Sequence, residues 1–303
     1  MKNNEATYVC PLCGSGATSL FAEVGDYAVS NESYKLIKCD TCGIIHTVDA
    51  PVGDMKEDYR TLEQELYRAD HPQRLFDRIY YNMRFITIRR RIRLIENLTR
   101  LKKGKLLNYG AKSGFFSSRM SDRGWKVTSL EEYHEHRIFS LEMFHHRMME
   151  LSEIDSLPAE SYDVITLWHF FEHHKNPEQL IDKLRALLKP NGLLLIACPN
   201  TDSYDAAYYG QYWAAWDVPR HLWHFNPSSM LKLGLRHNLI LMYHKRIPFD
   251  VFYISLLSEQ YRNKRYKTLR GLAMGVYFWY KSNWRRGKSS SIVYVFRKNN
   301  TKQ

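Results

Sequence analysis

The sequence lacks the features that direct a chain into a membrane or along a secretory route. None of its apolar runs is long enough to span a bilayer, and the first residues, Met-Lys-Asn-Asn-Glu, contain no apolar core of a secretory signal. We therefore expect a cytoplasmic location. The 303 residues contain no internal repeat, and they suffice for one large and one small domain, each with its own core.

Acidic residues are missing from the last part of the chain. Residues 261–303 contain twelve Lys and Arg and no Asp or Glu, and residues 72–105 contain eleven Lys and Arg against two acids. The whole chain has a formal charge of +12, so the remainder is net acidic. This distribution indicates an anionic partner, namely a phosphorylated substrate, RNA or a membrane surface; solvated helix faces are the alternative. The run Tyr277-Phe-Trp-Tyr280 beside Lys281 permits peripheral membrane contact.

Cysteine is scarce, and its placement is informative. Four of the five cysteines form two Cys-x-x-Cys pairs, each followed by glycine: Cys10, Cys13, Cys39 and Cys42. Two such knuckles can direct four thiolates at one ion, which predicts a closed, structural zinc site. The loop between the pairs is longer than the commonest zinc-ribbon spacing, and a redox dithiol is the competing interpretation. Cys198 lies in an apolar run and is expected to be a buried structural thiol.

Hydrophobic periodicity divides the chain into three parts. We expect a zinc-ribbon module at 1–50, a linker and basic covering helix at 51–104, and the main domain at 105–303. In the main domain, strands alternate with helices, which indicates a mostly parallel α/β sheet. Strands are expected near 105–109, 126–130, 162–168, 192–198, 239–246 and 291–297. Helices are expected near 115–122, 134–148, 177–189 and 227–236, with a helical insertion at 251–286.

A glycine-bearing turn follows the first strand of this domain. Gly110 and Gly114 are spaced as in a Gly-x-Gly-x-Gly turn, with Lys112 in the place of the middle glycine. A strand that turns into a helix N-terminus is a natural seat for a polar cofactor. Glu131 ends the second strand about 20 residues later, where an acid can accept hydrogen bonds from both hydroxyls of a ribose. An ordinary strand–helix turn with surface acids is the alternative.

Four later segments resemble the class I S-adenosylmethionine-dependent methyltransferases. They are Ser161–His174 with its aromatic-Glu-His turn, Leu188-Lys-Pro-Asn-Gly192, Pro199-Asn200, and the Pro-Arg-His-Leu segment within Trp216–Phe225. The resemblance covers about Lys105–Lys245, and members of this branch also carry an N-terminal Cys₄ module. It implies a Rossmann-like seven-stranded methyltransferase sheet with an N-terminal zinc ribbon and a C-terminal helical insertion.

The resemblance also implies positions for the cofactor S-adenosylmethionine. Its methionine part would lie by Asn108, Gly110, Ala111 and Gly114, its ribose on Glu131, and its sulfonium end above Trp168, His169 and Phe170. Two positions depart from the family pattern, because Asn108 stands where the first-strand acid is usual and Lys112 replaces a glycine. The adenine-side acid stays open among Glu150, Ser152 and Glu153.

Histidines near the expected strand ends are candidates for proton transfer. Methyl transfer is an in-line displacement, so the protein chiefly aligns the acceptor and removes a proton. His221 is the first candidate base, and His224, Glu172 and His173 follow; each histidine could instead be structural. Arg220 could hold an anionic group of the acceptor, and Tyr67 and His71 could close the pocket. The formal match His169-Phe-Phe-Glu-His173 to inverted zinc peptidases is disfavoured because that chemistry needs one continuous helix.

Three functions remain open on the sequence. The first is S-adenosylmethionine-dependent methyl transfer to a small acceptor, with an anionic group on the acceptor as one option. The second is methylation of RNA, which the zinc ribbon and the basic charge would fit. The third is a non-catalytic binding protein that keeps the fold, for which Asn108 and Lys112 speak.

Overall fold

The computed structural model describes residues 8–51, 75–262 and 265–299, which fall into two compact units. The ribbon unit comprises Met1–Val52, Phe171–Glu178 and Ala197–Tyr294. The glycine-loop unit comprises Gly53–Phe170, Gln179–Ile196 and Val295–Gln303. Tyr67 and His71, the two candidates for closing the pocket, lie outside the described residues. No helix in the described ranges combines the length and apolar character that crossing a membrane requires.

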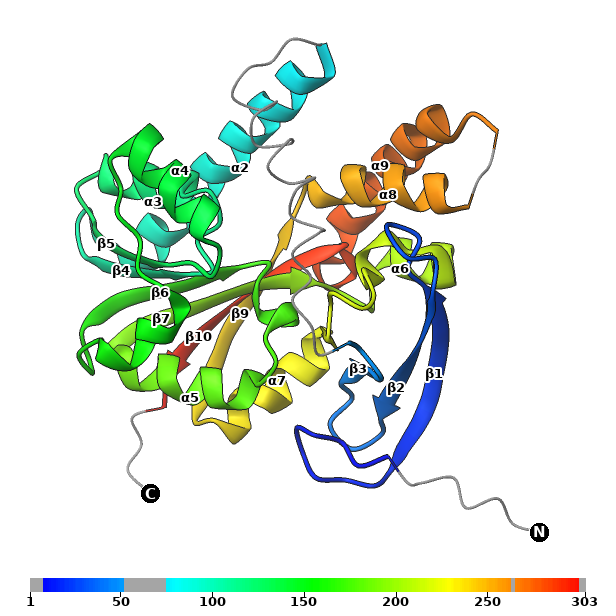
Figure 1. Ribbon diagram of the computed structural model, residues 1–303, viewed down its shortest axis with the longest axis horizontal. Helices are drawn as coiled ribbons and strands as arrows, with labels where there is room; N and C mark the ends of the chain where they lie inside the picture. Colours follow the sequence, from blue (N-terminus) through cyan, green and yellow to red (C-terminus); the bar gives the residue numbers. More distant parts are fainter. Residues whose placement is uncertain (1–7, 52–74, 263–264, 300–303) are drawn as a thin grey trace. The chain divides into compact units, whose positions relative to one another are not determined.

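The main sheet has six strands in the order β5-β4-β6-β7-β10-β9 (Figure 1). The strands are β4 (Lys105–Tyr109), β5 (Lys126–Leu130), β6 (Tyr162–Trp168), β7 (Leu188–Pro199), β9 (Leu239–Ile247) and β10 (Ser291–Lys298). Strand β4 pairs in parallel with β5 and with β6, so the carboxyl ends of these three strands meet at one edge. The expected Rossmann-like α/β fold is confirmed, and β4, β5 and β6 begin and end at the predicted residues.

The resemblance implies seven strands, but the described part of the main sheet has six. Beyond β5 the sheet is extended only by the single residue Met149. Met149 forms an isolated parallel bridge with Leu130, its N–H donates to the carbonyl of Ser129, and its own carbonyl accepts from Glu131 N. Directly afterwards the 3₁₀ helix η1 (Leu151–Ser156) begins, and Glu150 and Glu153 close a capping box around its first turn. The strand ends early because the next residue already caps a helix.

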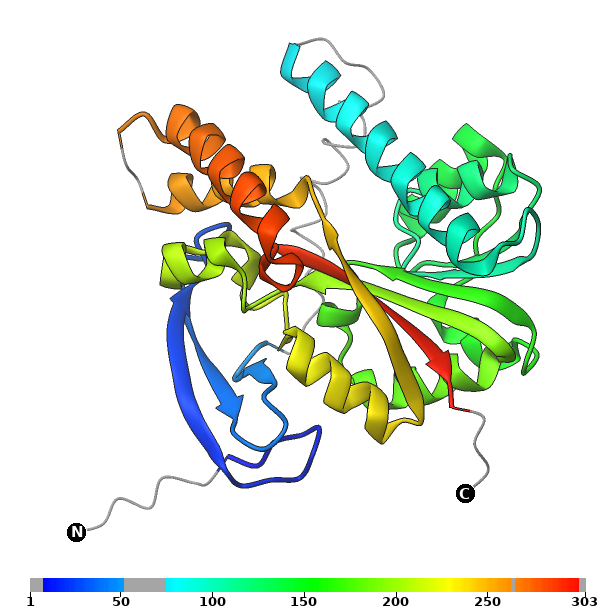
Figure 2. The ribbon, with the colours of Figure 1, turned by 180° about the vertical axis from the view of Figure 1, so that it is seen from behind.

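Helices cover both faces of the sheet in the glycine-loop unit. Figures 1 and 2 show α2 (Leu75–Thr99), α3 (Phe115–Ser121) and α4 (His134–Phe144) on one face and α5 (Pro177–Leu187) on the other. Along α2, Ile88, Ile92 and Ile95 are buried, whereas Arg89 and Arg93 are exposed. This is the amphipathic covering helix that the sequence predicts.

The ribbon unit contains a second, four-stranded sheet in the order β1-β2-β3-β8. Its strands are β1 (Thr18–Gly25), β2 (Ser33–Cys39), β3 (Ile45–Thr47) and β8 (Trp223–His224). All three pairings are antiparallel. The fourth strand directly follows the Pro-Arg-His-Leu segment, and in it His224 pairs with Ile45 and Trp223 with His46. The edge of the ribbon is therefore completed by residues far along the chain.

The remaining helices of the ribbon unit come from the second half of the chain. They are α6 (Tyr204–Tyr209), α7 (Pro227–Arg236), α8 (Asp250–Tyr261) and α9 (Lys267–Trp284), with 3₁₀ turns η3 (Gly210–Tyr212) and η4 (Ala214–Trp216). Helices α8 and α9 lie between β9 and β10, as the expected C-terminal helical insertion. Trp213, Tyr209 and Leu36 are almost fully buried, so the ribbon unit has its own aromatic core.

Candidate functional site

The four paired cysteines converge at one point of the ribbon unit. Their Sγ atoms all lie within 4.8 Å of one another, with 3.7 Å between Cys10 and Cys42 and 3.4 Å between Cys13 and Cys39. Four sulfurs around a tetrahedral zinc stand about 3.8 Å apart, given Zn–S bonds of about 2.3 Å. Gly14 and Gly43 adopt positive φ angles of 69° and 79°, which lets each knuckle turn back on its pair. The donor set and spacing fit a closed tetrahedral metal site.

The glycine turn of the other unit is held by its own backbone hydrogen bonds. The N–H groups of Gly110 and Ala111 both donate to the carbonyl of Leu130, at 2.9 and 3.0 Å. Gly110 has a φ of +70°, and a Cβ at this position would stand 2.1 Å from the ring of Phe170. Only glycine fits there, because both the conformation and the space exclude a side chain.

Lys112, in the place of the middle glycine, also adopts a left-handed conformation with φ 51°. Its side chain is exposed. Its N–H donates to Glu131 Oε2 at 2.6 Å, so the backbone of the turn closes onto the end of β5. The lysine thus takes the backbone shape that glycine favours, and its side chain is exposed.

Glu131 is the buried anchor of this loop. Its carboxylate also accepts hydrogen bonds at Oε1 from Tyr133 N and His136 Nδ1, both at 3.2 Å, and the residue is 2 % exposed. An ionised carboxylate offers roughly four acceptor positions, so these three donors leave capacity for one more. The acid stands at the end of the second strand, as predicted.

Asn108 lies beneath the turn in a chain of buried neutral hydrogen bonds. Its Nδ2 donates to Ser117 Oγ at 3.0 Å, and its Oδ1 accepts from Thr166 Oγ1 at 2.9 Å. Ser129 Oγ in turn donates to Ser117 Oγ at 2.8 Å. Every side chain in this chain is uncharged, so the amide fits where a buried carboxylate would need a cationic partner.

Strand β6 ends with the three residues expected near the sulfonium. Trp168 is 5 % exposed, stacks under the guanidinium of Arg91 at 4.4 Å and packs edge-on against Phe116. His169 has a φ of 52°, which turns the chain sharply at the strand end, and Phe170 packs edge-on against Tyr109. The structure therefore brings Phe170 to the glycine turn, at Gly110.

Of the candidates for proton transfer, Glu172, His173 and His221 gather in the ribbon unit. Each offers a ligand atom within 4.8 Å of the others, and the two imidazole rings meet edge-on with centroids 4.6 Å apart. His173 Nδ1 donates to the carbonyl of Arg220 at 3.0 Å, and His221 Nδ1 donates to the carbonyl of Ala215 at 2.9 Å. Because a carbonyl oxygen can only accept, both Nδ1 atoms carry the proton, and in the neutral rings both Nε2 atoms are basic.

His224 has a different environment. It is 4 % exposed, and its Nε2 lies 2.8 Å from Thr47 Oγ1, whose hydroxyl proton is donated to the carbonyl of His221 at 2.7 Å. His224 must therefore donate from Nε2, which fixes the opposite tautomer. Burial, together with neighbouring His221, holds the pKa of His224 well below its ordinary value. This ring is a neutral structural element beneath His221.

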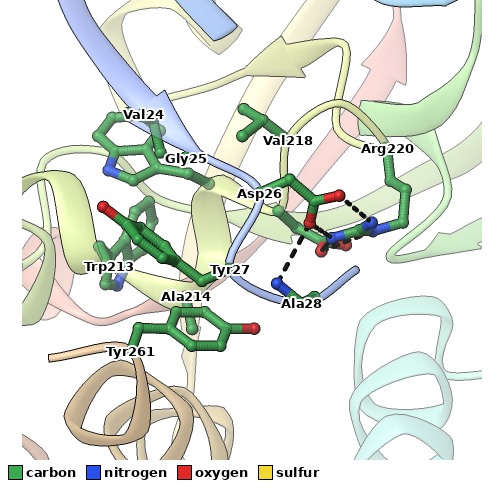
Figure 3. A pocket seen from close by; sticks show the side chains of 12 residues that line it. Val24, Gly25, Asp26, Tyr27, Ala28, Trp213, Ala214, Val218, Arg220 and Tyr261 are labelled. Carbon is green, nitrogen blue, oxygen red and sulfur yellow. Dashed lines mark hydrogen bonds and ion pairs between the residues drawn. The ribbon is translucent and has the colours of Figure 1, made fainter. Parts of the chain in front are cut away.

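Arg220 is bound by two carboxylates of the ribbon unit. Its guanidinium donates to Asp217 Oδ1 at 2.6 Å and to Asp26 Oδ1 at 2.9 Å, beside a shallow pocket that Tyr27 and Tyr261 also line (Figure 3). Burial tends to raise the pKa of Asp26, but the hydrogen bonds and charge of Arg220 hold that pKa below its usual value. Asp217 Oδ2 also stands 3.7 Å from His221 Nε2.

Sequence reasoning missed three residues that shape this site. Asp217, four positions before His221, had a signal in that spacing, which places a carboxylate beside an imidazole within one turn. Asp26 and Thr47 had none, because they reach Arg220 and His221 only through pairings of distant segments.

The fold and these positions define an α/β methyltransferase-type chain. The family model described as a methyltransferase domain matches residues 63–242, more than half of the chain. The chain therefore belongs to the methyltransferase domain family, and the resemblance drawn from the sequence is confirmed.

Curated relatives include ubiquinone biosynthesis O-methyltransferases. The protein from Histophilus somni is 31% identical over 111 residues, which cover 33% of this chain and 47% of the relative. The protein from Haemophilus ducreyi is 29% identical over 107 residues, covering 32% and 45%. The chain thus spans about half the length of the curated relatives it matches.

Solved structures share lower similarity. A 1,6-didemethyltoxoflavin-N1-methyltransferase from Burkholderia thailandensis, solved with bound S-adenosylhomocysteine, aligns at 14% identity with a TM-score of 0.48 over 85% of this chain and 96% of that one. The [4+2]-cyclase SpnF aligns at 14% identity with a TM-score of 0.49, over 69% and 80%.

Proposed function

We propose that this protein transfers a methyl group from S-adenosylmethionine to a small acceptor that loses a proton in the reaction, with a hydroxyl as the favoured acceptor group. Membership in the methyltransferase domain family supports the reaction class, and the O-methyltransferase names of the curated relatives support the acceptor. The observation that carries the proposal is the pair of basic Nε2 atoms on His173 and His221.

The glycine-loop unit would hold the cofactor, which supplies an activated methyl group on a sulfonium. Glu131 has acceptor capacity left for a ribose hydroxyl, and the turn from Gly110 to Gly114 presents backbone and small side chains. Asn108 would support the turn from below as a neutral amide. Trp168, His169 and Phe170 would form the floor at the end of β6. The exposed side chain of Lys112 is compatible with this assignment.

The ribbon unit would provide the base. His221 Nε2 would accept the acceptor proton, since its Nδ1–H is held by a backbone carbonyl. Asp217, 3.7 Å from the same Nε2, would stabilise the imidazolium that forms. Glu172 and His173 would share the proton or position the acceptor, and His224 would support His221 from beneath through Thr47.

Arg220 as the ligand of an anionic acceptor group remains a proposal. The acceptor would have to share the guanidinium with Asp26 and Asp217, both already bonded to it. Tyr27 and Tyr261 line the same small pocket with their ring centroids 5.4 Å apart, so a ring-shaped acceptor would have to displace one of them (Figure 3).

Zinc is proposed for Cys10, Cys13, Cys39 and Cys42. Four sulfurs leave no open coordination position, so the ion would stabilise the ribbon and take no part in the reaction.

Calorimetric titration with S-adenosylmethionine and S-adenosylhomocysteine tests the cofactor. Binding of either supports the enzyme; absence of both at about millimolar concentration would establish the non-catalytic alternative, since that affinity is near the weakest that calorimetry of a specific site detects. A radiolabelled methyl-transfer assay with catechols, phenols, amines and RNA then identifies the acceptor class. Methylation of RNA, with binding that weakens steeply as salt rises, would replace the small-acceptor proposal.

A further inference from the structure

Helix α9 carries a row of large apolar side chains on the face that meets solvent. The residues that it buries are mostly small: Gly271, Gly275, Phe278 and Ser282. The residues that it exposes are mostly large and apolar: Leu269 (70 %), Leu272 (45 %), Val276 (55 %), Tyr277 (49 %), Tyr280 (59 %) and Trp284 (77 %). Because Met274, Phe278 and Trp279 pack on the core of the ribbon unit, this exposed row is an addition to the core-facing apolar stripe of an ordinary surface helix.

The inward face of α9 is built for close packing on α8 (Figure 2). A Cβ at Gly271 would stand 2.7 Å from Leu256 Cα, and one at Gly275 would stand 2.9 Å from Phe252 Cδ1. The helix pair therefore needs glycine at both positions. On the opposite face, the exposed residues follow helical spacings of three, four, four and four and form one stripe roughly 22 Å long. The residues of the stripe are Leu269, Leu272, Val276, Tyr280 and Trp284.

The charge around this stripe has one sign. Residues 261–303 contain no Asp or Glu, and exposed cations stand at both ends of the stripe, with Lys267 before it and Arg285 after it. Within the described ranges, Arg270 of α9 donates to Glu259 of the neighbouring helix α8 at 3.2 Å. Two copies of such a face would repel each other, whereas an anionic surface complements it.

We propose that α9 is an in-plane docking helix for an anionic lipid membrane. Leu269, Leu272 and Val276 would enter the boundary between headgroups and acyl chains. Tyr280 and Trp284 suit the same depth, because their rings combine an apolar body with a polar edge. Lys267 and Arg285 would contact lipid phosphates. The proposal rests on this surface alone and holds whether or not the protein methylates a small acceptor.

Vesicle flotation of the full, zinc-loaded chain tests the proposal. Vesicles of equal parts phosphatidylglycerol and phosphatidylcholine should carry the protein up the gradient, and pure phosphatidylcholine should bind it at least about tenfold more weakly. The double variant Leu269→Gln/Val276→Gln should lose at least about tenfold in binding, because it removes two apolar groups from the contact. The matched control Leu231→Gln/Leu235→Gln changes two exposed leucines on α7, 42 % and 60 % exposed, and should bind like the unchanged chain.

Three results would overturn the proposal. They are absence of binding to the anionic vesicles, equal loss in the α9 and α7 variants, and a concentration-dependent dimer that the α9 variant abolishes, which would make the stripe a contact between two copies. If the α9 variant fails to fold, fluorescence quenching of Trp284 provides a second measurement of membrane contact. Lipids with a spin label near the headgroup should quench Trp284, and Trp284→Phe should remove that quenched component; an unchanged signal contradicts the proposal.

Discussion

The two compact units present different chemistry at their candidate sites. In the glycine-loop unit the positions are set mostly by backbone, with a positive φ at Gly110 and N–H groups that close on Leu130 and Glu131, supported by the neutral side-chain amide of Asn108. In the ribbon unit they are set by titratable side chains: four thiols and a group of imidazoles and carboxylates. We therefore propose that one unit recognises a ligand and that the other binds metal and moves protons.

The largest effect is expected from removing a thiolate of the ribbon. Cys39→Ser should abolish stoichiometric zinc and destabilise the ribbon unit on the order of 5 kcal/mol, because metal binding is part of its folding free energy. Metal analysis and circular dichroism measure both quantities. The control is Thr41→Ala, which changes an exposed residue between Cys39 and Cys42 and should leave the zinc content and the stability unchanged. Full zinc content in Cys39→Ser would refute the Cys₄ assignment.

His221→Ala tests whether the two units have separable roles. Turnover should fall about 100-fold or more, since a positioned general base is worth that much. The affinity for S-adenosylhomocysteine should stay the same, because the cofactor is assigned to the other unit. The control is His134→Ala, an exposed histidine at the start of α4. Unchanged turnover in His221→Ala would remove this residue from the mechanism; assays with and without chelator show whether a divalent ion acts at the same cluster.

Gly110→Ala tests the backbone character of the cofactor loop. It should lower the free energy of unfolding by roughly 2–5 kcal/mol, through left-handed strain and collision with Phe170. Gly210→Ala in the ribbon unit shares the positive φ, 55°, but no atom lies within 4 Å of its added Cβ, so about 1–2 kcal/mol is expected. Urea unfolding measures both. Adding Phe170→Ala to Gly110→Ala should restore part of the loss; equal effects of the two glycine substitutions would show that strain alone matters.

Glu131→Gln tests the single acid of the glycine-loop site. An amide in place of the carboxylate must turn an NH₂ group toward Lys112 N or toward His136, so stability should fall by about 1–3 kcal/mol. S-adenosylhomocysteine should bind at least about tenfold more weakly, because the ribose loses a charged acceptor. Glu132→Gln, an exposed neighbour, is the control. Equal calorimetric affinities in all three chains would exclude Glu131 from the cofactor site.

The smallest effect concerns acid stability of the ribbon unit. Burial lowers the pKa of His46 to about 4, against 6.5 when unfolded. The unfolded chain therefore binds the proton first, and stability is present above pH 6.5 and is lost as the pH falls toward 4. His46→Gln should flatten this decline by about 2 kcal/mol between about pH 7 and pH 5, as measured by urea unfolding. An identical slope in both chains would show that His46 does not contribute.

The sequence predicts the local elements well and the long-range ones poorly. Strands β4, β5 and β6 and helix α7 have the predicted bounds, because apolar runs and turn residues mark both of their ends. The seventh strand that the resemblance implies is present only as the bridge at Met149, because Glu150 and Glu153 cap a helix there and helix capping competes with strand pairing.

In the candidate site, too, the sequence predicts local features and misses those that depend on distant segments. Glu131 and the cysteine pairs are readable because their spacing alone places them. The tautomers of His173, His221 and His224 are not readable, because each depends on a carbonyl or hydroxyl brought in from elsewhere. The exposed stripe of α9 could not be read either, since the same apolar positions would suit a buried helix.

Because β8 lies far along the chain, the ribbon sheet can be completed only late in synthesis. The ribbon cysteines are synthesised first and can bind metal early, but the edge of β3 acquires its partner only when His224 has left the ribosome, some 180 residues after Ile45. Until then that edge exposes unpaired backbone groups, which is the state most open to pairing with another chain. Synthesis rate and chaperone supply should therefore affect the yield of correctly folded ribbon.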